Sequence, residues 1–273
     1  MPSAAEFMAS VPHPTGASDA WAQGYAEELR GIVTRYAGRL PRSVQKHLGP
    51  SELGHECDRQ VVAKMAGARV TNHVADPWAS IMGTAGHAFV ADAFDWDNKH
   101  NGYFRWLTEE RVTPDPGPGA HPGTADLYDA HERALVDHKF QGESTRARLK
   151  AHGPPRHYLV QVLLYRRGYL NIGFPVDRVV IASWPRTKST LDDLYVWSRR
   201  PTAEDERLVD DVLTQTAFRQ QVAARVRAGD ISLMDVPAVP EDSECFFCGL
   251  YRPQAAYDGQ YGCPGTLAGK GRK

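Results

Sequence analysis

The sequence has no long apolar run and no strong charge of one sign. No stretch is long and apolar enough to cross a bilayer, and the first residues lack the basic start and apolar run of a secretory signal. The 32 Lys and Arg are balanced by 33 Asp and Glu, which excludes a protein that binds nucleic acid through its overall charge. We expect a globular cytoplasmic protein with one large domain, or one domain and an added lobe.

Cysteine is also scarce, with four residues in 273. Cys57 stands alone near the start, whereas Cys245, Cys248 and Cys263 lie close together near the end. In a reducing compartment disulfides are rare, and such groups more often bind metal. The C-x-x-C spacing and the Cys-Pro ending favour an iron–sulfur centre, whereas a zinc site or four unrelated buried cysteines are the alternatives.

Periodicity predicts an α/β fold. Apolar residues at helical spacing predict helices over residues 19–37, 51–66, 77–94, 158–170 and 201–227. Alternating patterns predict strands over residues 103–112, 124–129, 134–140, 178–184 and 191–197. We expect a mixed sheet centred on the hairpin of the second and third strands and flanked by helices. The predicted divisions are an arm and helix (1–50), a core (51–240), and a cysteine lobe with a basic tail (241–273).

Two acids and a lysine lie on this hairpin. Asp137 and Lys139 are two positions apart, so their side chains share one face of the strand. If the hairpin folds symmetrically about residues 131–132, Asp126 lies opposite Asp137, with Cβ atoms about 5 Å apart and like charges repelling. A cation between the carboxylates would relieve this repulsion, and oxygen ligands suit Mg²⁺ or Mn²⁺. The alternative is an exposed hairpin with charged surface residues.

Positive charge gathers just after the hairpin. Residues 139–188 carry ten Lys and Arg and two acids, a local excess of eight positive charges. A phosphate backbone would be attracted to this segment, and Arg146, Arg148 and Lys150 are the candidate contacts. The same pattern is equally typical of a solvated surface in an arginine-rich protein.

Four short motifs follow one another along the chain. They are Gly83-x-x-x-His87, Gly123-x-x-Asp126, Asp137-x-Lys139 and Gln161-x-x-x-Tyr165. In this order they resemble the RecB-like branch of the PD-(D/E)XK nuclease superfamily. The resemblance implies a restriction-endonuclease-like sheet and metal-dependent cleavage of DNA.

The same resemblance implies a role for each motif. The metal ligands would be His87, Asp126, Asp137 and the backbone carbonyl of His138. Lys139 would be catalytic, because an ammonium on the same face as the acids can orient a water or stabilise the transition state. Gln161 and Tyr165 would face the DNA and support the lysine, and Tyr158, one turn earlier, is a further candidate DNA contact.

The cysteine spacing is similar to that of the iron–sulfur exonucleases of this group, the CRISPR-associated and AddB-type proteins. There, one cysteine precedes the nuclease motifs and three follow them. The resemblance implies a structural [4Fe-4S] cluster and exonuclease activity on single-stranded DNA ends, with recombination, replication or CRISPR-adaptation proteins as partners. A non-catalytic DNA-binding or assembly protein with a four-cysteine metal site, and an endonuclease of the same fold, are the alternatives.

Overall fold

The structure is a computed structural model that describes residues 19–39, 48–72, 77–117, 120–238, 245–246 and 248–265. The chain forms two compact units, Met1–Val44 and Gln45–Lys273. The predicted arm, the basic tail and the boundary at 240 lie outside the described residues. In the first unit, the described helix is α2 (Asp19–Ala37), as predicted. Within the described residues, every helix is too short or too polar to span a lipid bilayer.

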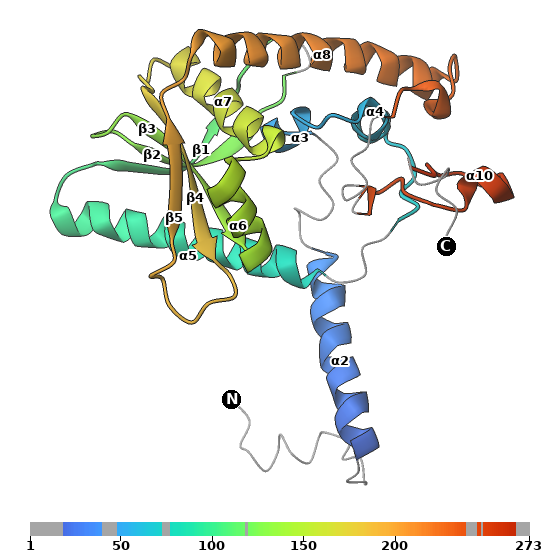
Figure 1. The fold of residues 1–273 in the computed structure, drawn as a ribbon, viewed down its shortest axis with the longest axis horizontal. Coiled ribbons are helices and arrows are strands. Elements are labelled where there is room, and N and C mark those ends of the chain that lie inside the picture. Colours follow the sequence, from blue (N-terminus) through green and yellow to red (C-terminus); the bar gives the residue numbers. More distant parts are fainter. Residues whose placement is uncertain are drawn as a thin grey trace, which may run out of the picture. The chain divides into compact units, whose positions relative to one another are not determined.

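The second unit is built on a five-stranded mixed sheet in the order β1-β2-β3-β4-β5 (Figure 1). The strands are β1 (Trp106–Val112), β2 (Gly123–Asp129), β3 (Ala134–Gln141), β4 (Arg178–Pro185) and β5 (Tyr195–Arg199). The β3–β4 pair is parallel, and the other three neighbouring pairs are antiparallel. The predicted α/β class with a mixed sheet is therefore confirmed.

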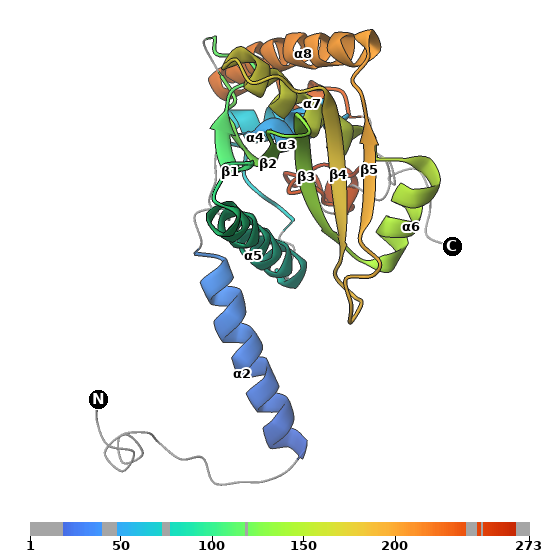
Figure 2. The same ribbon diagram turned by 90° about the vertical axis from the view of Figure 1, so that its left-hand side faces the viewer.

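Helices cover both faces of this sheet (Figures 1 and 2). The parallel β3–β4 pair requires a crossover connection, which α6 (Glu143–His152) and α7 (Arg156–Asn171) supply. Side chains alternate along β3, so His138 packs against α5 (Trp78–Asn101), whereas Lys139 bonds to a residue of α7. The residues of the four sequence motifs therefore lie between the sheet and two different helices.

A second layer of helices packs on α7. It consists of α3 (Pro50–Leu53), α4 (Asp58–Ala66) and α8 (Ala203–Ala228), with a short 3-10 turn η2 (Leu233–Asp235) and α10 (Ala255–Asp258) after them. The main core contains residues of the sheet, α7 and α8. A second core joins α4 and α8 to η2 and the cysteine-bearing segment.

The predicted helix over residues 51–66 is broken into α3 and α4. The break follows from packing, because a Cβ on Gly54 would lie 2.7 Å from side-chain atoms of Val160. Only a glycine lets the chain approach α7 so closely. The interruption places Cys57 at the N-cap of α4 rather than inside a helix. Sequence analysis also missed α6, whose residues are mostly polar.

Candidate active site and cysteine cluster

Asp126 lies where the β2–β3 ladder ends. Leu127 pairs with Val136, so one further step along the same register brings Asp126 opposite Asp137, as the symmetric hairpin predicts. At this point the backbone N–H of His138 donates to Asp126 Oδ2 over 2.6 Å. The other oxygen, Oδ1, lies 3.4 Å from His87 Nδ1. Burial alone would raise the pKa of Asp126, but His87 and Lys139 hold that pKa below its usual value.

Asp137 is almost completely buried, with 1% of its surface exposed. Its Oδ2 lies 2.7 Å from Lys139 Nζ, and Oδ1 has no hydrogen-bond partner in the described part of the chain. Burial raises the pKa of Asp137 to about 6; Lys139 opposes the shift and Asp126 adds to it. Burying a carboxylate with an oxygen that has no hydrogen-bond partner costs free energy of folding, unless a cation binds to that oxygen.

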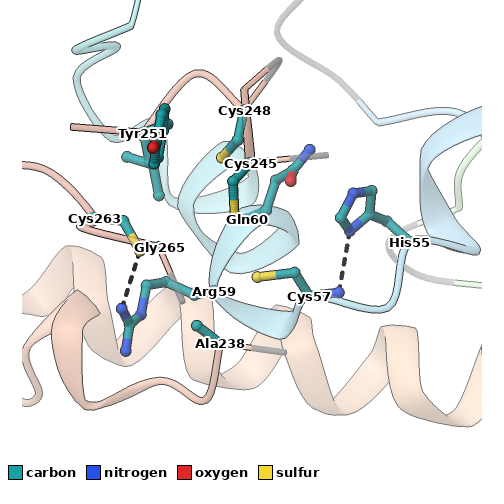
Figure 3. Close-up of a pocket in the computed structure, with 11 residues that line it drawn as sticks. His55, Cys57, Arg59, Gln60, Ala238, Cys245, Cys248, Tyr251, Cys263 and Gly265 are labelled. Carbon is teal, nitrogen blue, oxygen red and sulfur yellow. Dashed lines mark hydrogen bonds between the residues drawn. The ribbon is translucent and has the colours of Figure 1, made fainter. Parts of the chain in front are cut away.

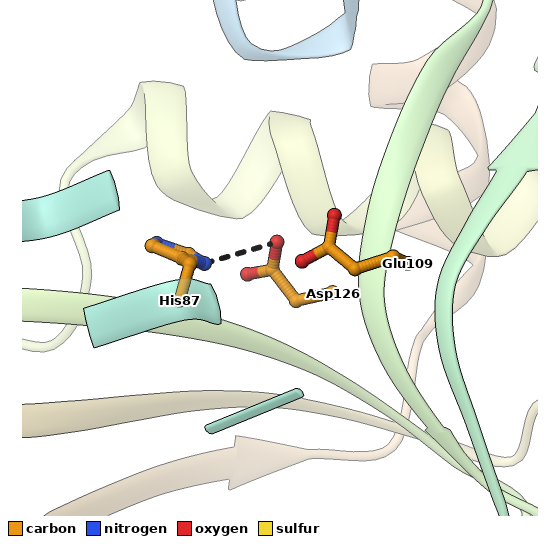
Figure 4. Close-up of side chains that lie close together, drawn as sticks. All are labelled: His87, Glu109 and Asp126. Atoms are coloured by element: carbon orange, nitrogen blue, oxygen red, sulfur yellow. Dashed lines mark ion pairs between the residues drawn. The ribbon is translucent and has the colours of Figure 1, made fainter. Parts of the chain in front are cut away.

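Glu109 is a third carboxylate, which sequence analysis did not identify. The flanking pairs Thr108–Leu127 and Glu110–Ala125 place it opposite Asp126, but the ladder skips this position. Glu109 has a φ of +52°, a left-handed conformation that costs a non-glycine residue about 1–3 kcal/mol and is concentrated at functional sites. Ligand atoms of Glu109, His87 and Asp126 lie within 4.8 Å of one another (Figure 4).

Three groups fix the position of the Lys139 ammonium beside the acids. Its Nζ contacts Asp137, donates to Gln161 Oε1 over 3.0 Å, and lies 4.7 Å from the centroid of the Tyr158 ring. Burial by itself would lower the pKa of Lys139, but Asp137 and Asp126 raise that pKa above its ordinary value. The ammonium therefore stays charged and is fixed in position by α7 and β3.

Tyr165 is brought to the same site by close packing. It is buried, with 6% of its surface exposed, and burial raises the pKa of its hydroxyl. A Cβ on Gly123 would lie 2.9 Å from the Tyr165 ring and 2.5 Å from Pro50 Cδ. The glycine of the Gly-x-x-Asp motif is therefore needed because α3, α7 and β2 meet there without room for a side chain.

The His138 side chain points away from the acids. Its ring stacks on Phe94 with a centroid separation of 6.0 Å, and Nδ1 accepts a hydrogen bond from Trp184 Nε1 over 3.2 Å. Burial lowers the pKa of His138 to about 4, so the ring is neutral near pH 7. These side-chain contacts do not involve the backbone carbonyl of His138, which stays the predicted metal ligand.

The predicted phosphate contacts on α6 differ in exposure. Arg146 is buried, with 1% of its surface exposed, and its Nη1 donates to Asp193 over 2.6 Å. Lys150 is exposed and also donates to Asp193, and Arg148 is exposed. Arg148 and Lys150 are therefore accessible to a phosphate, whereas Arg146 is held inside the fold by its ion pair.

The four cysteines are all buried and free of disulfides. They line one pocket together with residues that include His55, Arg59 and Tyr251 (Figure 3). Burial raises the pKa of the Cys248 thiol, and the other three cysteines add to this shift, as expected for thiols that lie close together. We call Cys57, Cys245, Cys248 and Cys263 the cysteine cluster.

Hydrogen bonds fix the cysteine cluster in the fold. Arg59 Nη1 donates to Cys263 Sγ over 3.1 Å, and its Nε and Nη2 donate to backbone carbonyls of Val236 and Met234. The N–H of Cys263 donates to the Leu250 carbonyl over 2.7 Å. The first and last parts of this unit are therefore already joined by protein contacts alone.

Comparisons with known proteins give distant matches. No family model and no curated protein matches the chain. Among solved structures, a protein designated SSO0001 is 13% identical, with 89% of this chain and 98% of that chain covered and a TM-score of 0.47. An alkaline exonuclease, LHK-Exo from Laribacter hongkongensis, is 14% identical, with coverages of 68% and 95% and a TM-score of 0.44.

A phage-related exonuclease from Haemophilus somnus is similar at 12% identity. The match covers 62% of this chain and 83% of that chain, with a TM-score of 0.39. At these identities and TM-scores, the function has to be inferred from the residues of the site themselves.

Proposed function

We propose that this protein is a metal-dependent deoxyribonuclease that removes nucleotides from DNA ends. The observation that carries the proposal is the convergence of Glu109, Asp126 and Asp137 beside a charged lysine. Three carboxylates and a lysine gathered on the neighbouring strands β1, β2 and β3 are a costly arrangement for stability alone. Hydrolysis of a phosphodiester can use both kinds of group, because carboxylates hold a metal ion and an ammonium stabilises charge on the phosphate.

The donor set fits a hard divalent cation such as Mg²⁺ or Mn²⁺. Asp126 and Asp137 would share the ion, with Glu109, His87 and the carbonyl of His138 completing the oxygen-rich shell. A bound ion would supply charge neutralisation for the scissile phosphate and a more acidic water. The His138 N–H fixes one oxygen of Asp126 and leaves the other directed towards His87.

Lys139 would stabilise the charge that develops on the phosphate. Its Nζ is already oriented by Asp137 and Gln161, so little reorganisation would be needed during the reaction. Tyr165 and Tyr158 lie on the same helix as Gln161. We assign these side chains to positioning the lysine and the DNA strand beside it. Exposed Arg148 and Lys150 would contact phosphates further along the strand.

We further propose that the cysteine cluster binds a structural [4Fe-4S] cluster. All four cysteines line the same pocket, which supports one shared metal centre. The C-x-x-C spacing and the Cys-Pro ending favour iron–sulfur over zinc.

The proposal is tested with anaerobically purified protein and end-labelled DNA. We expect Mn²⁺ or Mg²⁺ to support the release of nucleotides from linear single strands, and EDTA to stop it. Asp126→Asn, Asp137→Asn and Lys139→Ala should each lower the rate by about 10²–10³-fold, whereas Asp92→Asn, at an exposed position of α5, should not.

Two outcomes would contradict this proposal. Rapid cutting of covalently closed single-stranded circles would make the protein an endonuclease. DNA binding without any cleavage in either metal would make it a non-catalytic DNA-binding protein.

A further inference from the structure

Helix α2 carries an apolar stripe on its surface. Tyr25, Leu29, Ile32 and Tyr36 follow one another at intervals of four, three and four residues. Between 46% and 66% of the surface of each is exposed. This is the heptad spacing of a helix that packs against another helix. In proteins, most of the stability of a helix comes from the packing of its apolar face, so the stripe is expected to be covered by a partner.

The stripe is self-complementary when two copies run antiparallel. With Leu29 of one copy across from Ile32 of the other, Tyr25 of each copy falls across from Tyr36 of the other. The interface then repeats the same two layers on both sides of a two-fold axis. Such isologous contacts close after two subunits and form a dimer.

The residues beside the stripe favour the antiparallel orientation. Glu28 and Arg35 lie seven positions apart on one flank, and Ala26 and Val33 lie on the other. In an antiparallel pair, Glu28 of each copy faces Arg35 of the other, which makes two opposite-charge contacts. In a parallel pair, Glu28 would instead face Val33. In the antiparallel pair, Ala26 of each copy also packs against Val33 of the other on the apolar flank.

From this charge and size complementarity we propose that α2 is a dimerisation helix, which pairs antiparallel with α2 of a second copy of this chain. The interface is made by the stripe and closed by the two Glu28–Arg35 contacts. This inference concerns assembly and does not depend on the proposed nuclease activity.

Charge exchange in the full chain tests the pairing. Sedimentation over a concentration series should give a dimer for the natural sequence. Glu28→Arg alone or Arg35→Glu alone should raise the dissociation constant about tenfold, because two attractive contacts become repulsive. The double variant should recover the original value, and an equimolar mixture of the two single variants should form the mixed dimer preferentially.

Two further variants separate the stripe from the rest of the helix. Leu29→Glu should abolish the dimer, whereas Glu27→Arg, on the opposite face of α2, should leave it unchanged. A chain that is monomeric at every concentration would overturn the proposal, because the stripe would then be covered within one chain or by another partner. A dimer that responds equally to Glu27→Arg and Glu28→Arg would also overturn it.

Discussion

Glu109 combines an unfavourable backbone conformation with a position beside two other acids. A left-handed φ in a strand is retained when the surrounding structure needs the side chain in that place. The neighbouring Glu110 is also exposed but keeps its place in the ladder opposite Ala125. Glu109 can therefore be substituted to test the proposed metal site, and the adjacent Glu110 serves as the matched control.

Glu109→Gln should weaken metal binding while keeping the side-chain shape. Loss of one carboxylate charge near the ion should raise the Mg²⁺ concentration for half-maximal activity by roughly tenfold, the scale of about 1.4 kcal/mol. A titration of initial cleavage rate against Mg²⁺ measures this shift. The control, Glu110→Gln, should titrate like the natural protein, and equal curves for both variants would remove Glu109 from the site.

The buried carboxyl of Asp137 should make the metal-free fold sensitive to pH. Its pKa rises from an ordinary value of 3.8 to about 6 on folding. The folded state then holds this proton more tightly, so the group destabilises the metal-free fold progressively as pH rises from about 4 to 6. Below about pH 6, the ion must also displace the proton from Asp137.

Mg²⁺ should therefore stabilise the protein more at pH 7.5 than at pH 5, as measured by the shift of the unfolding temperature. In Asp137→Asn, the pH dependence of metal-free unfolding between 4 and 6 should be smaller. An Mg²⁺ shift of the same size at both pH values would contradict the role of this carboxyl.

At the scale of elements, close packing of α5 on the sheet positions His87. The Gly-x-x-x-His motif begins at Gly83, but a Cβ there meets nothing within 4 Å. A Cβ on Gly86 would instead lie 2.5 Å from the Phe140 ring. Gly86 is therefore the residue that lets α5 approach β3 and brings His87 to Asp126.

Alanine at these two glycines should have opposite effects on stability. Gly83→Ala should raise the free energy of unfolding by up to about 1 kcal/mol, because alanine favours a helix. Gly86→Ala should lower it by about 1–2 kcal/mol, since overpacking against Phe140 exceeds that gain. Denaturant unfolding of both variants checks the signs, and stabilisation by Gly86→Ala would show that α5 can move away without cost.

At the scale of the whole molecule, helices α7 and α8 both bond to the segment that carries Cys57, residues 53–58. Arg219 of α8 donates to the carbonyls of Leu53 and His55 and to Asp58, and Arg156 of α7 donates to the carbonyl of Gly54. The segment therefore contacts the helix that bears Gln161 on one side and the cysteine cluster on the other. A metal bound by the cluster would stabilise the proposed active site through these contacts.

Loss of Cys57 should therefore affect the whole molecule. Anaerobically purified protein should be brown, with iron and sulfide in equal amounts, and Cys57→Ser should lose both as fully as Cys248→Ser. In the chain-entropy model, breaking a link that closes a loop of this length should cost roughly 5 kcal/mol of stability.

The matched control is Gln60→Ala, which changes the pocket lining without removing a thiolate and should keep the colour. A colourless protein with stoichiometric zinc would contradict the iron–sulfur assignment. Retention of iron in Cys57→Ser would show that the upstream cysteine is not a ligand.

The sequence by itself determined the features that depend on local periodicity. Strand alternation puts Asp137 and Lys139 on one face, and the symmetry of a hairpin places Asp126 opposite Asp137. The order of β2, β3 and the helix with Gln161 could be predicted for the same reason, because each element has its own period. The spacing of the cysteines likewise predicted one metal centre, and all four cysteines line the same pocket.

Only the tertiary structure decided which distant residues meet. Glu109 joins the acids because the β1–β2 ladder skips one position, and Arg146 is buried because Asp193 reaches it from the β4–β5 connection. The break before Cys57 depends on the distance between Gly54 and Val160. Such features arise from packing between segments far apart in the chain, and no period or motif within one segment contains that information.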